Sequence, residues 1–164
     1  MEEVKKLIDR FNLQPHPEGG YYASTYRSTL EIPKEALPKG FGGGRPVSSA
    51  IYFLLEKNNF SAFHRIQSDE CWHFYEGDSL GLHCLSPTGI YRFIKLGRGP
   101  QCLYQYVVPA GDWFAAEPMP ESSYSFVGCT VSPGFDFEEW ELAKRSQLLQ
   151  AFPSYHELIH RLTR

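Results

Sequence analysis

The densest group of side chains able to do acid–base chemistry lies between residues 63 and 77. Its ionisable members include His64, Glu70 and His73, which are set among phenylalanine, tryptophan and tyrosine residues. An apolar setting shifts the pKa values of such groups and makes proton transfer near neutral pH possible. We therefore take these three residues as the candidate catalytic group. For any one of them alone, a solvent-facing or packed side chain is the simpler interpretation.

Three other patterns match catalytic motifs but fit structural roles better. Residues 156–160 read HExxH, the zinc-protease motif. Glu157 is expected to form a capping box with Ser154, so an exposed helix face is favoured there. Residues 77–81 read GxSxG, but strand-like residues flank the pattern and predict a hairpin turn instead of a nucleophile elbow. The glycine-rich stretch at 40–44 lacks a following Lys-Ser/Thr and predicts a surface loop that could cover a pocket.

The elements that must position these residues are mostly short strands. Apolar residues at helical spacing predict a helix over 2–12, and capping signals at Asp136 and Ser154 predict helices over about 136–150 and after Pro153. Strand-like runs occupy residues 21–28, 48–55, 60–66, 70–76, 80–85, 91–96, 104–108 and 124–131. Turn signals separate these runs, a spacing typical of an all-β sandwich or barrel.

Composition excludes several classes of protein. The formal net charge of −3 gives no basic footprint for a nucleic acid polymer. No apolar run reaches the roughly 18 residues that a membrane span needs, and the first residues do not resemble a signal peptide. The four cysteines form no CxxC pair. We expect a cytoplasmic protein with no membrane and no nucleic acid partner.

Several residues resemble the cupin superfamily, in particular the cupin-like branch of unknown function called cupin family five. His64, Glu70 and Gly77 stand at positions of the first cupin motif, and Pro109-Ala110-Gly111 resembles part of the second. The segments 16–22, 48–55 and 69–73 resemble the same branch. The resemblance implies an all-β fold, a double-stranded β-helix or jelly-roll barrel with short N-terminal and C-terminal helices, in a single cupin-like domain over 1–164.

The departures from the cupin motifs argue against a tight metal site. Cupin metals take three histidines and a glutamate, whereas Ile66 and Phe114 stand where two of the histidines would be. His73 could replace one only if a bulge near Cys71 turned it inward, since a regular strand puts residues 70 and 73 on opposite faces. We expect no metal ligands and no cofactor, with only a weakly held divalent ion at His64 and Glu70 left open.

Three functions remain open. The first, implied by metal-free cupin epimerases, is an isomerase or epimerase acting on a sugar nucleotide or related carbonyl compound, with His64 as base and a tyrosine returning a proton. The second is a non-catalytic binding module for a nucleotide, sugar or other planar small molecule, and the third is a metal-dependent cupin enzyme. The candidate proton-returning tyrosines are Tyr52, Tyr75, Tyr106 and Tyr124, and the candidate ligand-binding residues are Tyr52, Trp72, Phe74, Tyr75 and Phe114, with Trp113 as a further stacking surface.

Two further expectations concern the first strand. Glu18 and Arg27 flank it, and a surface ion pair is the favoured interpretation, with a contribution to the barrel mouth as the alternative. The run 21–28 is also an edge-strand candidate that needs covering. The resemblance implies that a second copy covers it in a homodimer.

Overall fold

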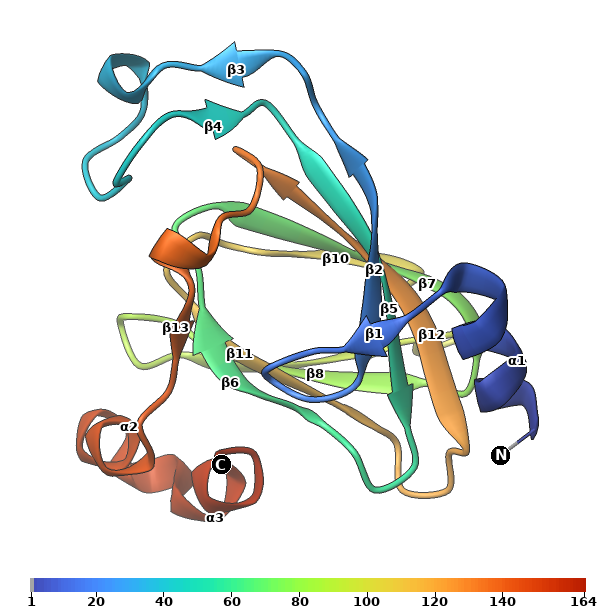
Figure 1. Cartoon of the computed structure of the whole chain (residues 1–164). Helices are drawn as coiled ribbons and strands as arrows, with labels where there is room; N and C mark the ends of the chain where they lie inside the picture. Colours follow the sequence, from blue (N-terminus) through green and yellow to red (C-terminus); the bar gives the residue numbers. More distant parts are fainter. Residues whose placement is uncertain (1) are drawn as a thin grey trace.

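Two antiparallel sheets pack face to face in the computed structural model, which describes residues 2–164 (Figure 1). One sheet has six strands in the order β1-β2-β5-β12-β7-β10, and the other has five in the order β13-β6-β11-β8-β9. The six-stranded sheet consists of β1 (Gln14–Pro15), β2 (Tyr21–Arg27), β5 (Ser49–Glu56), β12 (Tyr124–Ser132), β7 (Asp69–Gly77) and β10 (Gln105–Val108). The five-stranded sheet consists of β13 (Glu141–Leu142), β6 (Ser61–Arg65), β11 (Trp113–Pro118), β8 (Leu80–Leu85) and β9 (Tyr91–Leu96).

The main core lies between the two sheets because successive side chains of a strand alternate between faces. On β7, the even-numbered residues Glu70, Trp72 and Phe74 are buried on the inner face. Phe53 of β5 and Phe114 of β11 meet the Trp72 ring edge-on, at 5.8 and 6.3 Å between ring centroids. The fold is therefore the mostly β jelly roll that the sequence predicts.

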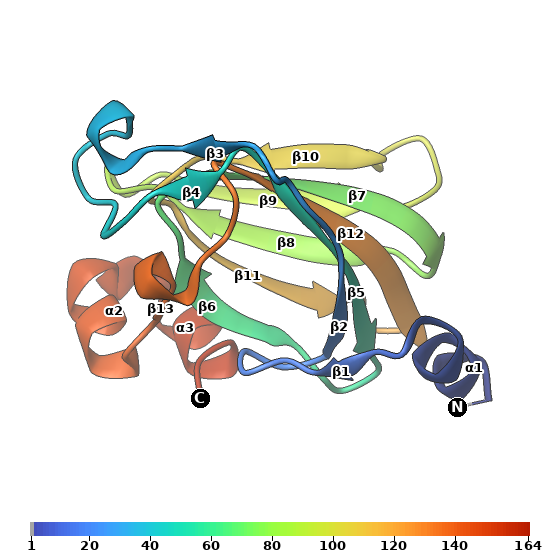
Figure 2. The same ribbon diagram turned by 45° about the horizontal axis from the view of Figure 1, so that its top comes forward.

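Helices cover the outside of the barrel in two places. α1 (Glu2–Phe11) buries Val4 and Leu7 on the outer face of the six-stranded sheet, against Leu54 and Phe126. α2 (Arg145–Ala151) and α3 (His156–Arg161) pack beside β6 at the other end of the chain (Figure 2). No helix within residues 2–164 has both the length and the apolar character that crossing a bilayer requires.

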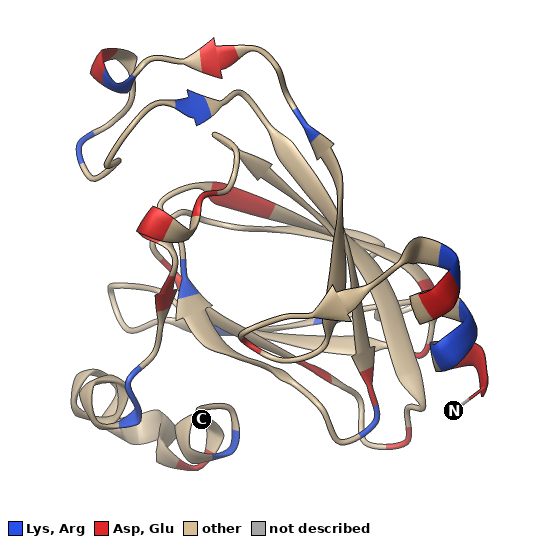
Figure 3. Cartoon of the chain, in the orientation of Figure 1, with Lys and Arg blue, Asp and Glu red and all other residues tan. Residues whose placement is uncertain are grey.

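Two irregular segments lie at one end of the barrel. The arm, residues 28–48, contains β3 (Glu31–Ile32), the 3₁₀ turn η1 (Lys34–Ala36) and β4 (Arg45–Pro46), and it extends beyond the sheets (Figure 1). The strap, residues 133–140, leads from β12 to β13 and contains the 3₁₀ turn η2 (Phe137–Glu139). The acidic η2 and the basic β4 are visible in Figure 3. They are joined where buried Arg45 donates through Nε to Glu139 over 2.8 Å and pairs with Glu138 over 3.1 Å.

The structure differs from the predicted elements in three places. β11, which lies between β6 and β8, is not among the strands that the sequence pattern predicts. The predicted helix over 136–150 is wrong in its first half: Asp136 caps only η2, β13 follows, and α2 begins at Arg145. The Ser154–Glu157 capping box does not form, since the 3₁₀ turn η3 (Pro153–Tyr155) precedes α3 without a side-chain cap.

Candidate functional site

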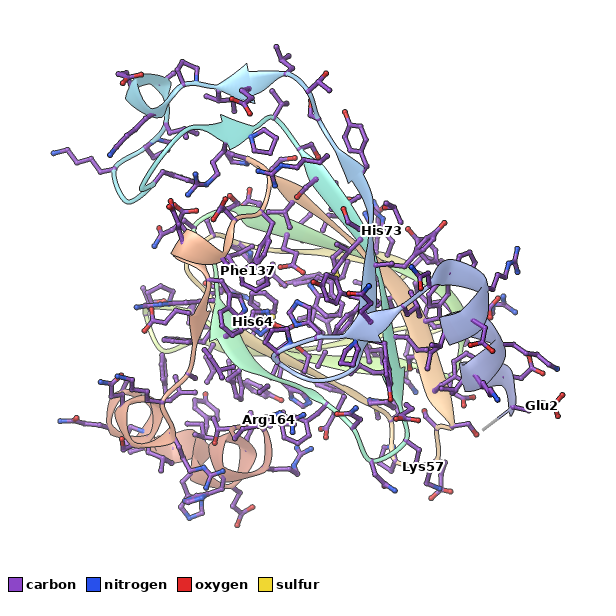
Figure 4. All side chains as sticks on the ribbon, viewed as in Figure 1. Glu2, Lys57, His64, His73, Phe137 and Arg164 are labelled. Carbon is purple, nitrogen blue, oxygen red and sulfur yellow. The ribbon has the colours of Figure 1, made fainter. Side chains whose placement is uncertain are left out.

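A cavity of about 130 Å³ lies inside the end of the barrel that the strap crosses. β2, β5, β6, β7 and β12 contribute its walls, and Phe135, Phe137 and Trp140 of the strap contribute aromatic rings. Figure 4 shows the labelled His64 and Phe137 at this end of the barrel. The remaining lining residues are His16, Glu18, Tyr22, Ser24, Arg27, Ser49, Ala50, Ile51, Ile66, Glu70, Cys129 and Val131.

Glu18 is the carboxyl group at which most polar contacts of the cavity meet. Its side chain is buried, and Ser61 Oγ donates to Oε1 over 2.9 Å. Trp140 Nε1 donates to Oε2 over 3.3 Å, and His64 Nε2 lies 3.1 Å from the same oxygen. Burial raises the pKa of Glu18 above its ordinary value, because desolvation penalises the charged carboxylate.

Two glycines hold Glu18 in this position. Gly19 has a φ of +115° and Gly20 a φ of +75°, which L side chains rarely adopt. A Cβ on Gly19 would also lie 2.0 Å from the carbonyl oxygen of Phe60. The chain therefore turns tightly after Glu18, whose carbonyl accepts from the Ala62 amide of β6 over 2.9 Å. Only glycine allows this close approach of the two segments.

His64 is oriented by the backbone of its own strand. Its Nδ1 lies 2.7 Å from the Ala62 carbonyl oxygen, an acceptor, so Nδ1 carries a proton. In a neutral imidazole Nε2 is then the acceptor, and the contact with Glu18 requires one proton between the two groups. Phe114 packs on the ring at 4.1 Å between centroids, and burial lowers the pKa of His64 to about 4. Glu18 and His64 therefore share a single proton.

Glu70 supplies a second ionisable group to the same cavity. It lies on the inner face of β7 and is buried. Its pKa is raised to about 8, chiefly by burial and also by the neighbouring carboxyl group of Glu18, while a hydrogen bond with Cys129 acts in the opposite direction. Glu70 thus holds its proton at neutral pH and is an acid facing the Glu18–His64 pair.

His16 completes the polar wall. The backbone N–H of Glu18 donates to His16 Nδ1 over 3.3 Å, which makes Nδ1 an acceptor and leaves any ring proton on Nε2. The ring meets Tyr22 edge-on at 4.7 Å, and burial lowers its pKa below the ordinary value. His16 is therefore a neutral ring that packs against the acid–base group.

Comparison with known proteins gives the family. A family model described as "Cupin superfamily (DUF985)" matches residues 5–143, most of the chain. The chain belongs to this cupin family. A protein of Shewanella oneidensis, SO0799, has 35% identity and a TM-score of 0.86, covering 98% of this chain and 96% of that one. A hypothetical protein from Leishmania major has 32% identity and a TM-score of 0.86, covering 97% of each chain.

Two further comparisons have lower sequence identity and cover less of the matched protein. The uncharacterized protein YML079W of Saccharomyces cerevisiae is 29% identical over 155 residues, covering 86% of this chain and 75% of that protein. An oxalate decarboxylase of Bacillus subtilis has 14% identity and a TM-score of 0.55, covering 90% of this chain and 36% of the decarboxylase. At that identity the likeness concerns the cupin fold alone.

The donor set of this cupin does not fit the metal of the superfamily. His64 and Glu70 line the cavity, but Ile66 and Phe114 present apolar side chains at the other two motif positions. In the described part of the chain, residues 2–164, no three His, Cys, Asp or Glu side chains are grouped so that they could hold an ion. Catalytic metal sites typically take three protein ligands. The residues present are suited to acid–base chemistry of their own.

The structure brings together only part of the predicted catalytic group. His64 and Glu70 line one cavity, whereas His73 lies on the outer face of β7, with Nε2 3.1 Å from Thr130 Oγ1 (Figure 4). The grouping of His73 with the other two is therefore corrected. The register of β7 against β12 is regular from Asp69 to Phe74, so no bulge at Cys71 turns His73 inward.

The predicted ligand-binding aromatics are divided in the same way. Tyr52 and Tyr75 lie on the outer face of the six-stranded sheet, where their rings meet at 5.9 Å near α1. Trp72, Phe74 and Phe114 lie inside the barrel but belong to its packed core and do not line the cavity. These five residues therefore do not meet at one pocket, and the prediction that they do is corrected. The rings that do line it belong to Tyr22, Phe135, Phe137 and Trp140.

The remaining motif interpretations can be compared with the structure directly. The predicted hairpin at residues 77–81 is wrong, because β7 and β8 belong to different sheets and do not pair; the segment instead turns the chain from one sheet to the other, with strands on both sides and no helix after it. His156 and His160 are exposed on α3, with ring centroids 6.3 Å apart. The surface ion pair of Glu18 with Arg27 is wrong, because Glu18 is buried against His64; both residues line the cavity, which is the alternative that the sequence analysis named.

Sequence reasoning missed Glu18 as the central carboxyl group, although one signal was present. A glutamate followed by two glycines and then a strand suggests a backbone turn that fixes the carboxyl group. Trp140 gave no comparable signal. Its contact with Glu18 joins residues 122 positions apart and depends on the path of the strap.

Proposed function

We propose that this cupin is a metal-independent acid–base enzyme of the isomerase or epimerase class, acting on a small carbonyl compound. The observation that carries the proposal is the 3.1 Å contact between Glu18 Oε2 and His64 Nε2, with Glu70 in the same cavity. Ionisable groups with opposed pKa shifts in one buried cleft are typical of acid–base sites.

The proton transfers balance without any further reactant. Glu70 gives its proton to the carbonyl oxygen of the substrate while the Glu18–His64 pair accepts a proton from the adjacent carbon. The resulting enol then takes a proton from the pair, on the other face or on the neighbouring carbon, and Glu70 recovers its own proton. The charge gained by the pair is matched by the charge that Glu70 acquires, so the cavity stays neutral overall.

Glu70 takes the role that the sequence analysis gave to a tyrosine. Tyr52, Tyr75, Tyr106 and Tyr124 are not among the residues lining the cavity. Tyr22 does line it, but its ring packs against His16. A carboxylic acid with a pKa of about 8 can donate a proton at neutral pH, which an ordinary carboxyl group cannot.

The size of the cavity favours a small carbonyl compound over a whole sugar nucleotide. A cavity of roughly 150 Å³ holds benzene, and the cavity here measures about 130 Å³. Two arginines near the site in the sequence, Arg45 and Arg65, are also engaged with carboxylates instead of facing a nucleotide phosphate. Arg45 pairs with Glu138 and Glu139, and Arg65 pairs with Glu141 over 2.7 Å while stacking on Trp113.

The alternative function is binding without turnover. Phe135, Phe137 and Trp140 give the cavity a wall of aromatic rings, which suits a planar ligand. Such a module would bind the same compounds without moving a proton. Exchange of a carbon-bound hydrogen separates the two functions.

The test is hydrogen exchange in D₂O followed by proton NMR. The probes are dihydroxyacetone, dihydroxyacetone phosphate, pyruvate and methyl pyruvate. Wild-type protein should accelerate exchange next to the carbonyl of at least one probe, and Glu18→Gln, His64→Asn and Glu70→Gln should each lower the rate about 100-fold or more. His73→Gln on the outer face is the matched control and should keep the wild-type rate. Binding without exchange would favour the binding module, and exchange unaffected by the three variants would contradict the proposal.

We also propose that the protein is a homodimer, in which a second copy of the chain is the partner. β1 pairs only with Tyr21 and Tyr22, so the rest of the β2 edge has backbone groups free for another strand. Light scattering should then give twice the 18.8 kDa of one chain. A mass of one chain at micromolar concentration would contradict the homodimer.

A further inference from the structure

An irregularity in β2 decides which way Arg27 faces. Ser24 pairs with Ile51, but Tyr26 pairs with Ala50 and Arg27 with Ser49, so one extra residue, Thr25, is inserted against β5. Without this bulge, alternation would put Arg27 on the outer face. With it, Arg27 lies on the same face as Ser24 and lines the cavity. Bulges are frequent next to active sites, where they redirect a side chain.

The charge of Arg27 is not neutralised by a carboxylate. Its Nη1 donates to the Phe135 carbonyl oxygen of the strap over 3.0 Å. No Asp or Glu within residues 2–164 forms an ion pair with it, unlike Arg45 and Arg65. Arg27 is also the only Arg or Lys among the residues that line the cavity in the described part of the chain. Its other N–H groups remain available to a ligand.

Ser49 adds a second donor beside this cation. It is 8% exposed, lines the cavity and is paired with Arg27 across the strands. Its Oγ accepts the Phe135 backbone N–H over 2.8 Å, so the hydroxyl proton points elsewhere and has no acceptor within the described residues. The backbone of Phe135 therefore orients both groups, one through its N–H and one through its carbonyl.

We propose that Arg27 and Ser49 form an anion subsite, and that the substrate is a small carbonyl compound carrying a carboxylate or phosphate group. The proposal rests on the proposed function for the reacting end of the substrate. A guanidinium group with a neighbouring hydroxyl donor matches the oxygens of either anion. The anion would lie at the exposed Arg27, and the carbonyl would extend inward to Glu70 and the Glu18–His64 pair.

Matched charged and neutral probes test the subsite by calorimetric titration. Dihydroxyacetone phosphate is compared with dihydroxyacetone, and pyruvate with methyl pyruvate. At least one anionic probe should bind about ten-fold or more tightly than its neutral match, which is the range of one charge-assisted contact. The tighter of the two anions identifies the class as phosphate or carboxylate. Binding of the anion should weaken as salt is added.

The variants separate this proposal from the proposed function. Arg27→Gln should remove the preference for the anion, Ser49→Ala should reduce it, and the exposed Arg98→Gln should leave it unchanged. Anion binding that depends on Arg27 without hydrogen exchange supports the subsite and contradicts the proposed enzyme. Exchange of the anionic probes that is indifferent to Arg27→Gln supports the enzyme and overturns the subsite. Equal binding of charged and neutral probes, or no binding of either anion, also overturns it, provided that thermal unfolding shows Arg27→Gln to be folded.

Discussion

The shared proton of Glu18 and His64 depends on one backbone contact. Because Ala62 accepts from Nδ1, the histidine can meet Glu18 only through Nε2. Ser61 and Trp140 complete the hydrogen bonds of the carboxyl group, which is why a buried acid can exist there without a cation beside it. Burial favours the uncharged arrangement, in which the proton lies on Glu18.

The tautomer of His64 is a direct prediction of this geometry. Nitrogen-15 NMR of the imidazole should show Nδ1 protonated and Nε2 unprotonated between pH 6 and 8, because the pKa of His64 is lowered to about 4. His64→Asn keeps a donor near the Ala62 carbonyl and should remain folded. A ring protonated on both nitrogens at pH 7 would show the pair to be ionic and contradict the uncharged arrangement.

Individual residues of the site were only partly predictable from the sequence. His64 and Glu70 could be found because their spacing resembles the first cupin motif, and both line the cavity. The position of His73 on the opposite face from Glu70 follows from strand alternation, because three residues separate the two along a regular strand. The orientation of Arg27 was not predictable, since a bulge of one residue reverses the face of every side chain after it and leaves no clear mark in the sequence.

At the scale of elements, the strap and the arm close the cavity together. Arg45 is 3% exposed, and its partner Glu139 also accepts the Gly42 backbone N–H over 2.9 Å. This contact fixes the strap, whose Trp140 reaches Glu18. The glycine-rich loop at 40–44 thus has a structural role, because its backbone binds an acidic residue of the strap.

Glu139→Gln should loosen this closure. It removes the charge that faces Arg45 and leaves Glu138 as the remaining partner, so the free energy of unfolding should fall by about 2 kcal/mol. Hydrogen exchange of the Trp140 indole N–H should become faster, since the strap no longer holds it against Glu18. Glu141→Gln, at the next glutamate along the chain and half-exposed beside Arg65, is the control. Unchanged indole exchange in Glu139→Gln would show that the arm does not fix the strap.

The elements themselves followed the sequence wherever local signals were strong. The strands predicted from alternation and turn residues are present, whereas β11 was missed because its Ala-Ala pair has low strand propensity and tertiary packing makes the strand. The prediction of one helix from Asp136 onward is wrong for a similar reason. Asp136 does accept a backbone hydrogen bond, from Glu138, but β13 pairs with β6 and ends the turn before a helix can extend.

At the scale of the whole molecule, the site gives folding stability a dependence on pH. The folded protein holds two protons in the cavity, one on the Glu18–His64 pair and one on Glu70, whose pKa is raised to about 8. In the unfolded chain a glutamate loses its proton near pH 4.5 and a histidine near 6.5. His16 offsets one of these protons below about pH 6.5, because burial lowers its pKa and keeps it neutral in the folded protein, whereas the unfolded chain protonates it. Above pH 6.5 the folded state therefore binds more protons than the unfolded state, and the free energy of unfolding must fall as pH rises.

The expected profile has two slopes. Between pH 4.5 and 6.5 the cavity holds one proton more than the same groups of the unfolded chain, but the neutral His16 offsets it and the slope is small. Between 6.5 and 8 the excess is two protons, each worth about 1.4 kcal/mol per pH unit. The decline should therefore be steepest from pH 6.5 to 8, where Glu70 still holds its proton. Urea unfolding at a series of pH values measures this directly.

Glu70→Gln isolates one of the two protons. The amide keeps the shape of the protonated carboxyl group but cannot ionise, so the variant should lose one proton of the excess over the whole range. Relative to the wild type, its stability should therefore gain about 1.4 kcal/mol per pH unit, so that it falls half as steeply between pH 6.5 and 8 and exceeds that of the wild type at pH 8. Glu31→Gln on the exposed arm controls for the loss of a carboxylate and should keep the wild-type slopes. A Glu70→Gln profile parallel to the wild type would mean that Glu70 is ionised in the folded protein, and the acid assigned to the site would be lost.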